Sequence, residues 1–158
     1  MVQGNQKRKR KIRIFIDDTY KKSQNEGKYS VIINALTSAA NYWSKILKVE
    51  RLDFKLTKNM FDSYLIKQYH PDFDENKGIE ADLTIFPFFM AINPSSYLAL
   101  SDYCAMEGST LRSIGGTIQI NTNINTSKKH SDLFFTHYLC MNCLIFLDFY
   151  MINLSHLL

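Results

Sequence analysis

A nearly continuous apolar run in the middle of the chain, ADLTIFPFF at residues 81–89, constrains the fold more than any other segment. Such a run is typical of a strand that is buried on both faces of its sheet. Pro87 has no backbone N–H to donate, so we expect regular pairing of the strand to end there. A strand of this kind requires covering layers on both sides of the sheet, and the run therefore predicts a layered α/β domain.

The segments around this run predict the other layers. Alternating isoleucines indicate a strand over residues 11–16, and apolar residues at three- and four-residue steps indicate an amphipathic helix over residues 30–48, with Ser30 as its N-cap. Alternation predicts further strands over residues 49–56 and 115–121, whereas residues 97–108 remain ambiguous. We expect residues 59–77 to be irregular, with His70 in solvent. The order predicts a mixed α/β (α+β) sheet with helices. A length of 158 residues suits one domain, or part of a larger one.

Charge is concentrated at the N-terminus. Six cations and no acidic residue occur in the first 13 residues, and without these six the net charge of +4 becomes −2. The six are Lys7, Arg8, Lys9, Arg10, Lys11 and Arg13. Such a run is typical of a solvated tail, or of a nuclear-localisation or nucleic-acid patch. We interpret residues 1–10 as a basic tail and expect no nucleic-acid partner, because no basic stripe with interleaved aromatics follows. The pattern of a secretory signal peptide is absent.

The last segment, residues 133–158, is long and apolar enough to suggest a transmembrane helix. Polar residues interrupt it, and a central Asp148 is costly in a bilayer. A buried helix, or a sequence that is not the native end, fits better. Cys140 and Cys143 have C-x-x-C spacing, but a second ligand pair for zinc and a thioredoxin-like context are both missing.

Six segments, in this order, resemble the leishmanolysin family of zinc metallopeptidases, most closely the divergent members found in ciliates. They are RKIRIFIDDTY, an Ala-rich helix with YWSKILKV, GIEADLTIF, YLALSDYC, GGTIQINTNIN and SDLFF. The resemblance covers residues 11–137. It implies a metzincin-like N-terminal catalytic subdomain, here incomplete, with a twisted sheet and two long helices. The second helix of the family carries H-E-x-x-H, which binds zinc and supplies a general base.

The resemblance also implies a binding site for a peptide or protein substrate. The edge strand of the sheet would hold the peptide by strand addition. This strand would be formed by Gly116, Thr117, Ile118, Gln119, Ile120 and Asn121.

The chain departs from the family at the zinc helix. H-E-x-x-H occurs nowhere in it. The two His slots fall on Cys140 and Leu144, and the Glu slot falls on Met141. Leucine cannot ligate zinc and methionine cannot act as a base, so no catalytic or metal site is intact and we expect no bound zinc. The third His of the family would lie beyond the last residue. Cys104 matches a disulfide cysteine of the family, but its partner is not identified.

The genetic code offers an explanation for residues 138–158. In a reading frame shifted to the last base of each codon, the G of the Met141 codon ATG joins the AA that begins any Asn142 codon. The resulting triplet, GAA, encodes Glu whichever Asn codon is used. Permitted codons at Cys140 and Leu144 give His, and the shifted tail can read His-Glu-x-x-His-x-x-Gly-Phe. We therefore interpret this tail as aberrant, produced by a frameshift, a missed intron or a pseudogene lesion.

Three functions remain open at this point. The first is an inactive fragment of a leishmanolysin-like zinc metalloendopeptidase. The second is a non-catalytic module of the same fold that binds peptides or cell-surface partners. The third is a small membrane-attached protein held by residues 133–158. Members of the family are extracellular or bound to the cell surface, and the resemblance implies that location for an intact relative.

Overall fold

The computed structural model describes residues 8–20, 26–61, 63–70, 73, 77–91 and 99–121. Along the chain these residues form β1 (Arg10–Lys11), β2 (Ile14–Ile16), α1 (Glu26–Ile46), β3 (Lys48–Val49), the 3-10 helix η1 (Lys58–Met60), α2 (Tyr64–Tyr69), β4 (Leu83–Met90), β5 (Ala99–Met106) and β6 (Ser113–Asn121). The prediction of a mixed α/β arrangement is confirmed. The predictions for residues 127–132 and 133–158 lie outside the described residues.

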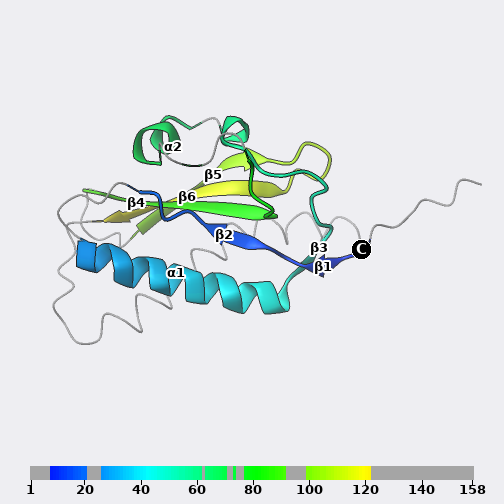
Figure 1. Cartoon of the computed structure of the whole chain (residues 1–158), viewed down its shortest axis with the longest axis horizontal. Helices are drawn as coiled ribbons and strands as arrows, with labels where there is room; N and C mark the ends of the chain where they lie inside the picture. The colour runs from blue at the N-terminus through cyan, green and yellow to red at the C-terminus, as the bar shows by residue number, and fades with distance from the viewer. Residues whose placement is uncertain are drawn as a thin grey trace, which may run out of the picture.

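The main sheet has four strands in the order β2-β4-β6-β5. β2, β4 and β6 run parallel, and β5 runs antiparallel to β6. β1 and β3 form a separate antiparallel pair at one end of the molecule (Figure 1). The parallel strands need crossovers, and α1 supplies the first of these between β2 and β4.

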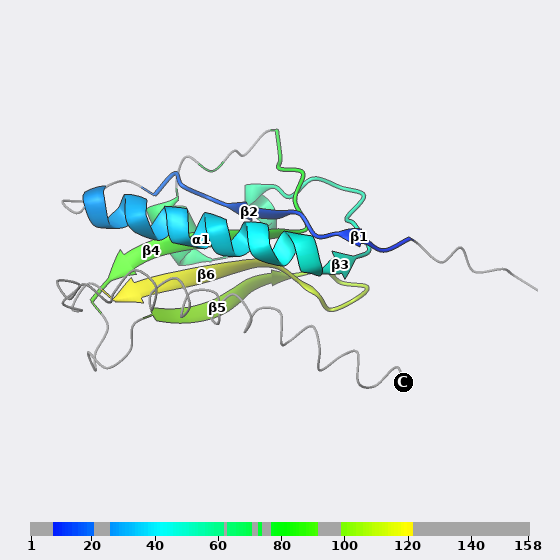
Figure 2. The same ribbon diagram turned by 90° about the horizontal axis from the view of Figure 1, so that it is seen from below.

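The two faces of the sheet are covered differently. α1 lies under one face, whereas α2 and η1 lie over the other (Figures 1 and 2). Buried Ile32 and Leu36 of α1 belong to one apolar cluster with Ile85, Ile118 and Ile120 of the sheet. The opposite cluster includes Phe61, Phe73 and Phe86, whose rings meet edge to face with centroids 5.0–5.7 Å apart. This double cover confirms that the 81–89 run is buried on both faces.

α1 agrees with the predicted helix but begins at Glu26, so Ser30 is inside the helix and is not its N-cap. The predicted strand over 49–56 is wrong in extent. Only Lys48–Val49 pair as a strand, and Leu56 forms an isolated bridge with Ile79. Alternation in this segment reflects separate burial of Val49 and Leu56, each at most 3% exposed, in two different clusters.

Pro87 does not end the pairing of β4, which continues to Met90 with Pro87 opposite Ile118. The reason is its position beyond the end of β2, whose last strand residue pairs with Ile85. The carbonyl of Ile85 accepts from the N–H of Asp17, so Ile85 faces β2, and the alternation of a strand points Pro87 to the same side. β2 has no strand residue opposite Pro87, so no carbonyl group of β2 loses a hydrogen bond because proline lacks an N–H.

Gly115, at the start of β6, marks a close approach between the sheet and η1. A Cβ at this position would overlap the ring of Phe61 and would also lie 3.1 Å from the sulfur of Cys104. Phe61 is 1% exposed and cannot move away without disturbing its cluster. Glycine is therefore required here by space.

Candidate functional site

The strand predicted to bind substrate, Gly116–Asn121, is not an edge strand. It belongs to β6, which pairs with β4 on one side and with β5 on the other. The prediction fails because residues 99–106, in the segment left ambiguous by its pattern, form a strand that returns antiparallel along β6 and occupies the edge. Of the predicted set, all except Gln119 are buried.

In the described part of the chain, β5 forms one edge of the four-stranded sheet and the three-residue β2 forms the other. The eight residues of β5, ALSDYCAM, contain neither lysine nor proline, the residues that usually protect an exposed edge from further pairing. Leu100, Tyr103 and Met106 are 39%, 52% and 40% exposed. The register shifts on both sides of Ala105, so the strand is irregular at that end. Its pairing with β6 is regular from Ala99 to Tyr103.

A groove of about 500 Å³ lies beside this edge, on the face of the sheet that carries α2. Side chains from the start of α2, from β5 and from β6 line it, with polar and apolar groups mixed. The lining residues are Ser63, Leu65, Asp102, Tyr103, Cys104, Ala105, Met106, Thr117 and Gln119. Asp102 gives the groove a carboxylate, so a basic side chain of a bound peptide fits best there.

Cys104 lines the groove but is not suited to nucleophilic chemistry. Burial raises the pKa of its thiol to about 12, and the charge of Asp102 acts in the same direction. The reactive thiolate is therefore scarce at neutral pH. Cys104 is a free cysteine, with no disulfide to any described residue.

A buried polar network that the sequence did not reveal fixes α2 to the sheet. His70, expected in solvent, is fully buried at the end of α2. Its Nε2 lies 2.9 Å from the carbonyl oxygen of Pro87, and its Nδ1 lies 2.7 Å from Oδ2 of Asp17, which follows β2. Thr19 donates its hydroxyl to the same Asp17 oxygen at 2.8 Å.

The two ring nitrogens of His70 make different contacts. A carbonyl oxygen only accepts, so Nε2 of His70 carries a hydrogen. Nδ1 lies close to the Asp17 carboxyl but does not meet it in hydrogen-bonding geometry. Asp17 and His70 are at most 1% exposed, so a substrate cannot reach them. We conclude that the pair has a positioning role, holding the helix whose Leu65 lines the groove.

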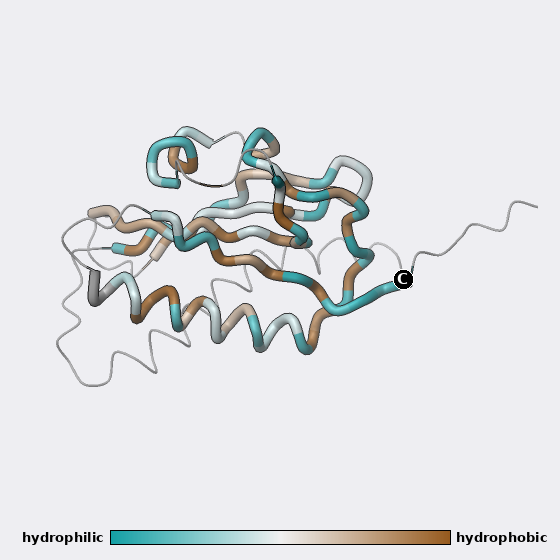
Figure 3. Tube along the Cα trace, viewed as in Figure 1, coloured by the Kyte–Doolittle hydropathy of each residue, from teal (hydrophilic) through white to brown (hydrophobic). Residues whose placement is uncertain are grey.

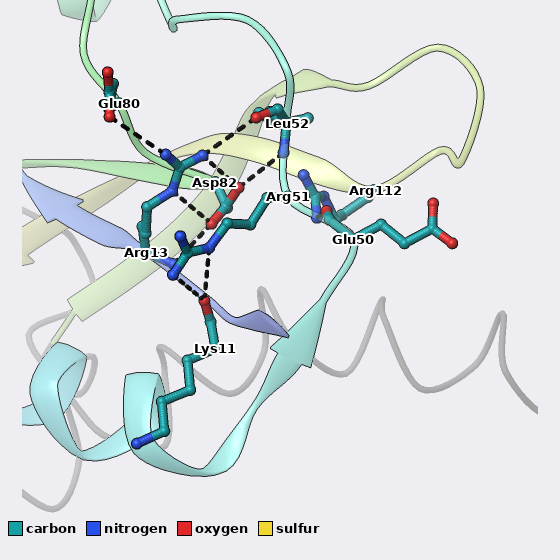
Figure 4. Close-up of polar contacts among 8 residues, drawn as sticks. All are labelled: Lys11, Arg13, Glu50, Arg51, Leu52, Glu80, Asp82 and Arg112. Atoms are coloured by element: carbon teal, nitrogen blue, oxygen red, sulfur yellow. Dashed lines mark hydrogen bonds and ion pairs between the residues drawn. The ribbon is translucent and has the colours of Figure 1, made fainter. Parts of the chain in front are cut away.

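A second network joins Arg13, just before β2, to Asp82, just before β4, and to the segment after β3 (Figure 4). Oδ2 of Asp82 accepts from the backbone N–H and the Nε of Arg13, at 2.9 and 3.1 Å. Oδ1 accepts from Nη2 of Arg13 and from the N–H of Leu52, both at 3.0 Å. Nη2 of Arg13 also donates to the carbonyl of Leu52 at 3.3 Å. Every oxygen of this fully buried carboxylate is paired twice, which identifies the network as structural.

The zinc prediction cannot be placed on this structure. Cys140, Met141 and Leu144 lie outside the described residues. Within the described ranges, the side chains include no group of three or more His, Cys, Asp or Glu able to hold a metal ion. The same ranges contain no helix that is both long and apolar enough to cross a membrane.

Comparison of the sequence with models of protein families and with curated proteins finds no match in either set.

Proposed function

We propose that this chain is the N-terminal half of a leishmanolysin-like catalytic region, and that it binds an extended peptide along β5 without cleaving it. The observation that carries the proposal is the position of β5, an antiparallel strand at the edge of the sheet with a groove beside it. Substrate binding by strand addition, which the resemblance places on the edge strand, is thus assigned to Ala99–Met106 in place of Gly116–Asn121.

Strand addition suits this edge physically. A peptide beside β5 would form main-chain hydrogen bonds with it, and its alternate side chains would point to opposite faces of the sheet. On the α2 face these side chains would meet the groove, where Asp102 favours a lysine or arginine and Leu65 favours an apolar neighbour.

The proposal gives this chain no hydrolytic step. Met141 and Leu144 stand in the slots for the general base and for a zinc ligand, and neither side chain can perform that role. An intact relative would use zinc to activate water for attack on the peptide carbonyl. This chain would bind without turnover and without a requirement for zinc.

Amide chemical shifts of the full-length chain test the proposal. A short synthetic peptide of alternating Thr and Val with one central Arg would be titrated in, and shifts are expected along Ala99–Met106. The same peptide N-methylated at alternate residues loses its main-chain donors and is expected not to bind. Shifts distributed elsewhere, or equal binding of the methylated peptide, would contradict strand addition.

A matched pair of variants tests the groove. Asp102→Asn is expected to abolish the tighter binding of a peptide with a central Arg over one with a central Glu. Glu80→Gln also removes one carboxylate, but outside the groove, so this variant should keep that preference. Casein would serve as substrate in a cleavage assay with added zinc. Zinc-dependent cleavage by the pure chain would overturn the inactive assignment.

A further inference from the structure

A basic surface lies where β1 pairs with β3, next to the last turn of α1. Seven exposed cationic side chains gather from two segments of the chain, residues 8–11 and 45–51. We call this surface the basic end; its members are Arg8, Lys9, Arg10, Lys11, Lys45, Lys48 and Arg51. Figure 3 shows β1 in the hydrophilic colour at the end of the molecule. The sequence reveals only the first of the two segments as a charge cluster.

Strand pairing brings two of these lysines directly opposite each other. Lys11 is the register partner of Lys48, and like charges in that arrangement destabilise a strand pair. Val49 and Ile12, the next residues along, are 3% exposed and point into the core, so alternation turns Lys11 and Lys48 outward. Arg51 donates to the carbonyl of Lys11 through both Nε and Nη2, at 3.4 Å each, which holds a third cation beside the pair.

Within the two segments, seven cationic residues stand against a single acidic one. Glu50 is the one acid within the two segments, and its carboxylate points away from Lys11 (Figure 4). Arg13, by contrast, is held by Asp82 at 3.0 Å and lies 3.7 Å from Glu80, so it is excluded from the basic end. The folding of the chain therefore leaves a concentrated positive field at one end of a body that is otherwise slightly acidic.

Two apolar side chains at the same end indicate which polyanion fits. Ile46 and Tyr42, one turn apart near the end of α1, are 52% and 55% exposed, and Ile46 stands between Lys45 and Lys48 in the sequence. An isoleucine gains little from a nucleic-acid phosphate backbone, but it gains from the boundary between lipid headgroups and acyl chains. We propose that the basic end binds the surface of a bilayer that contains anionic phospholipids, with Ile46 and Tyr42 entering the headgroup boundary.

Co-sedimentation of the full-length chain with vesicles tests this proposal. Phosphatidylcholine vesicles containing one third phosphatidylserine should bind the chain, and binding should fall as salt is raised. Each lysine near the surface contributes about a fivefold change in partitioning, so Lys11→Gln with Lys48→Gln should lower it about 25-fold. Lys67→Gln with Lys77→Gln removes the same charge outside the basic end and should change it less than twofold. Lys9→Gln with Lys45→Gln is the substitute pair if the first variant does not fold.

Ile46→Ser separates a membrane from other polyanions. It should lower partitioning to anionic vesicles several-fold and leave binding to a short DNA duplex unchanged. Equal binding to pure phosphatidylcholine vesicles, or equal losses in the Lys11/Lys48 and Lys67/Lys77 variants, would overturn the proposal. Tighter binding to the duplex than to the vesicles, with no effect of Ile46→Ser on the vesicles, would also overturn it.

Discussion

Asp82→Asn is expected to destabilise the chain by about 3–5 kcal/mol, the usual consequence of removing one partner from a buried ion pair. The side chain is fully buried and accepts four hydrogen bonds, two on each oxygen. Asparagine keeps the shape but replaces one oxygen with an NH₂ group. The two hydrogen bonds to that oxygen are then lost, because the new NH₂ group faces other donors, and Arg13 loses its buried counter-charge. Hydrogen bonds to a charged group contribute about 1.5–3 kcal/mol each, which gives a similar total.

Urea unfolding of the full-length chain, followed by fluorescence of its single tryptophan, Trp43, measures this loss. Glu80→Gln is the matched control, because Glu80 contacts the same arginine at 3.7 Å but its side chain is 71% exposed. We expect the control to cost about 0.5 kcal/mol or less. Equal losses in the two variants would refute the reasoning, since they would show that burial of Asp82 adds nothing to the pair.

The difference in unfolding free energy between the native chain and Asp82→Asn should decrease at low pH. Burial alone raises the pKa of Asp82, but hydrogen bonds from the Arg13 side chain and from the N–H groups of Arg13 and Leu52 outweigh burial and lower the pKa below 3.8. A carboxylate with a lowered folded-state pKa stabilises the fold above its unfolded-state pKa. The advantage of the native chain over Asp82→Asn should therefore be complete above about pH 4 and disappear as the pH falls through the lowered pKa.

Three further predictions concern packing and the β5–β6 connection. Gly115→Ala should cost about 1–3 kcal/mol by overlap with Phe61, while Gly108→Ala, where nothing lies within 4 Å, should be nearly neutral in the same urea assay. Leu111 has φ 55°, so Leu111→Gly should raise stability by about 0.5–1 kcal/mol, and a lower thermal midpoint would contradict this. Hydrogen bonds from Ser109 and Thr110 lower the pKa of Glu107 to about 2, so its small contribution should fade between about pH 4.5 and 2; an ordinary pKa in a carboxyl NMR titration would contradict this contact.

The hypothesis of a shifted frame has its own test. Genomic and transcript reads across the codons of residues 139–149 are expected to show codons at Cys140 and Leu144 that encode His in the shifted frame. A TGT codon at Cys140, with the printed frame confirmed, would rule out the reconstructed zinc helix.

Local pattern alone determined the parts of this fold whose surroundings are simple. The apolar run at 81–89 can be stable only where both faces are covered, and α1 on one side with Phe61 and Phe73 on the other provides that cover. The three- and four-residue spacing near residues 30–48 likewise required a helix with one apolar face. The start of α1 was predicted wrongly because Ser30 is typical of a cap, whereas the preceding turn, which begins at Glu26, is also helical.

Only the tertiary structure decided which strand lies at the edge, which histidine is buried and where charge accumulates. Alternation in Gly116–Asn121 is the same for a central or an edge strand, so the pairing of Ala99–Met106 settled the position of β6. His70 stands in a polar stretch, yet it is buried beside Asp17, which is 53 positions away in the sequence. Lys11 and Lys48 meet because β1 pairs with β3. Each of these depends on contacts between distant residues, whereas sequence periodicity reports only the neighbours along the chain.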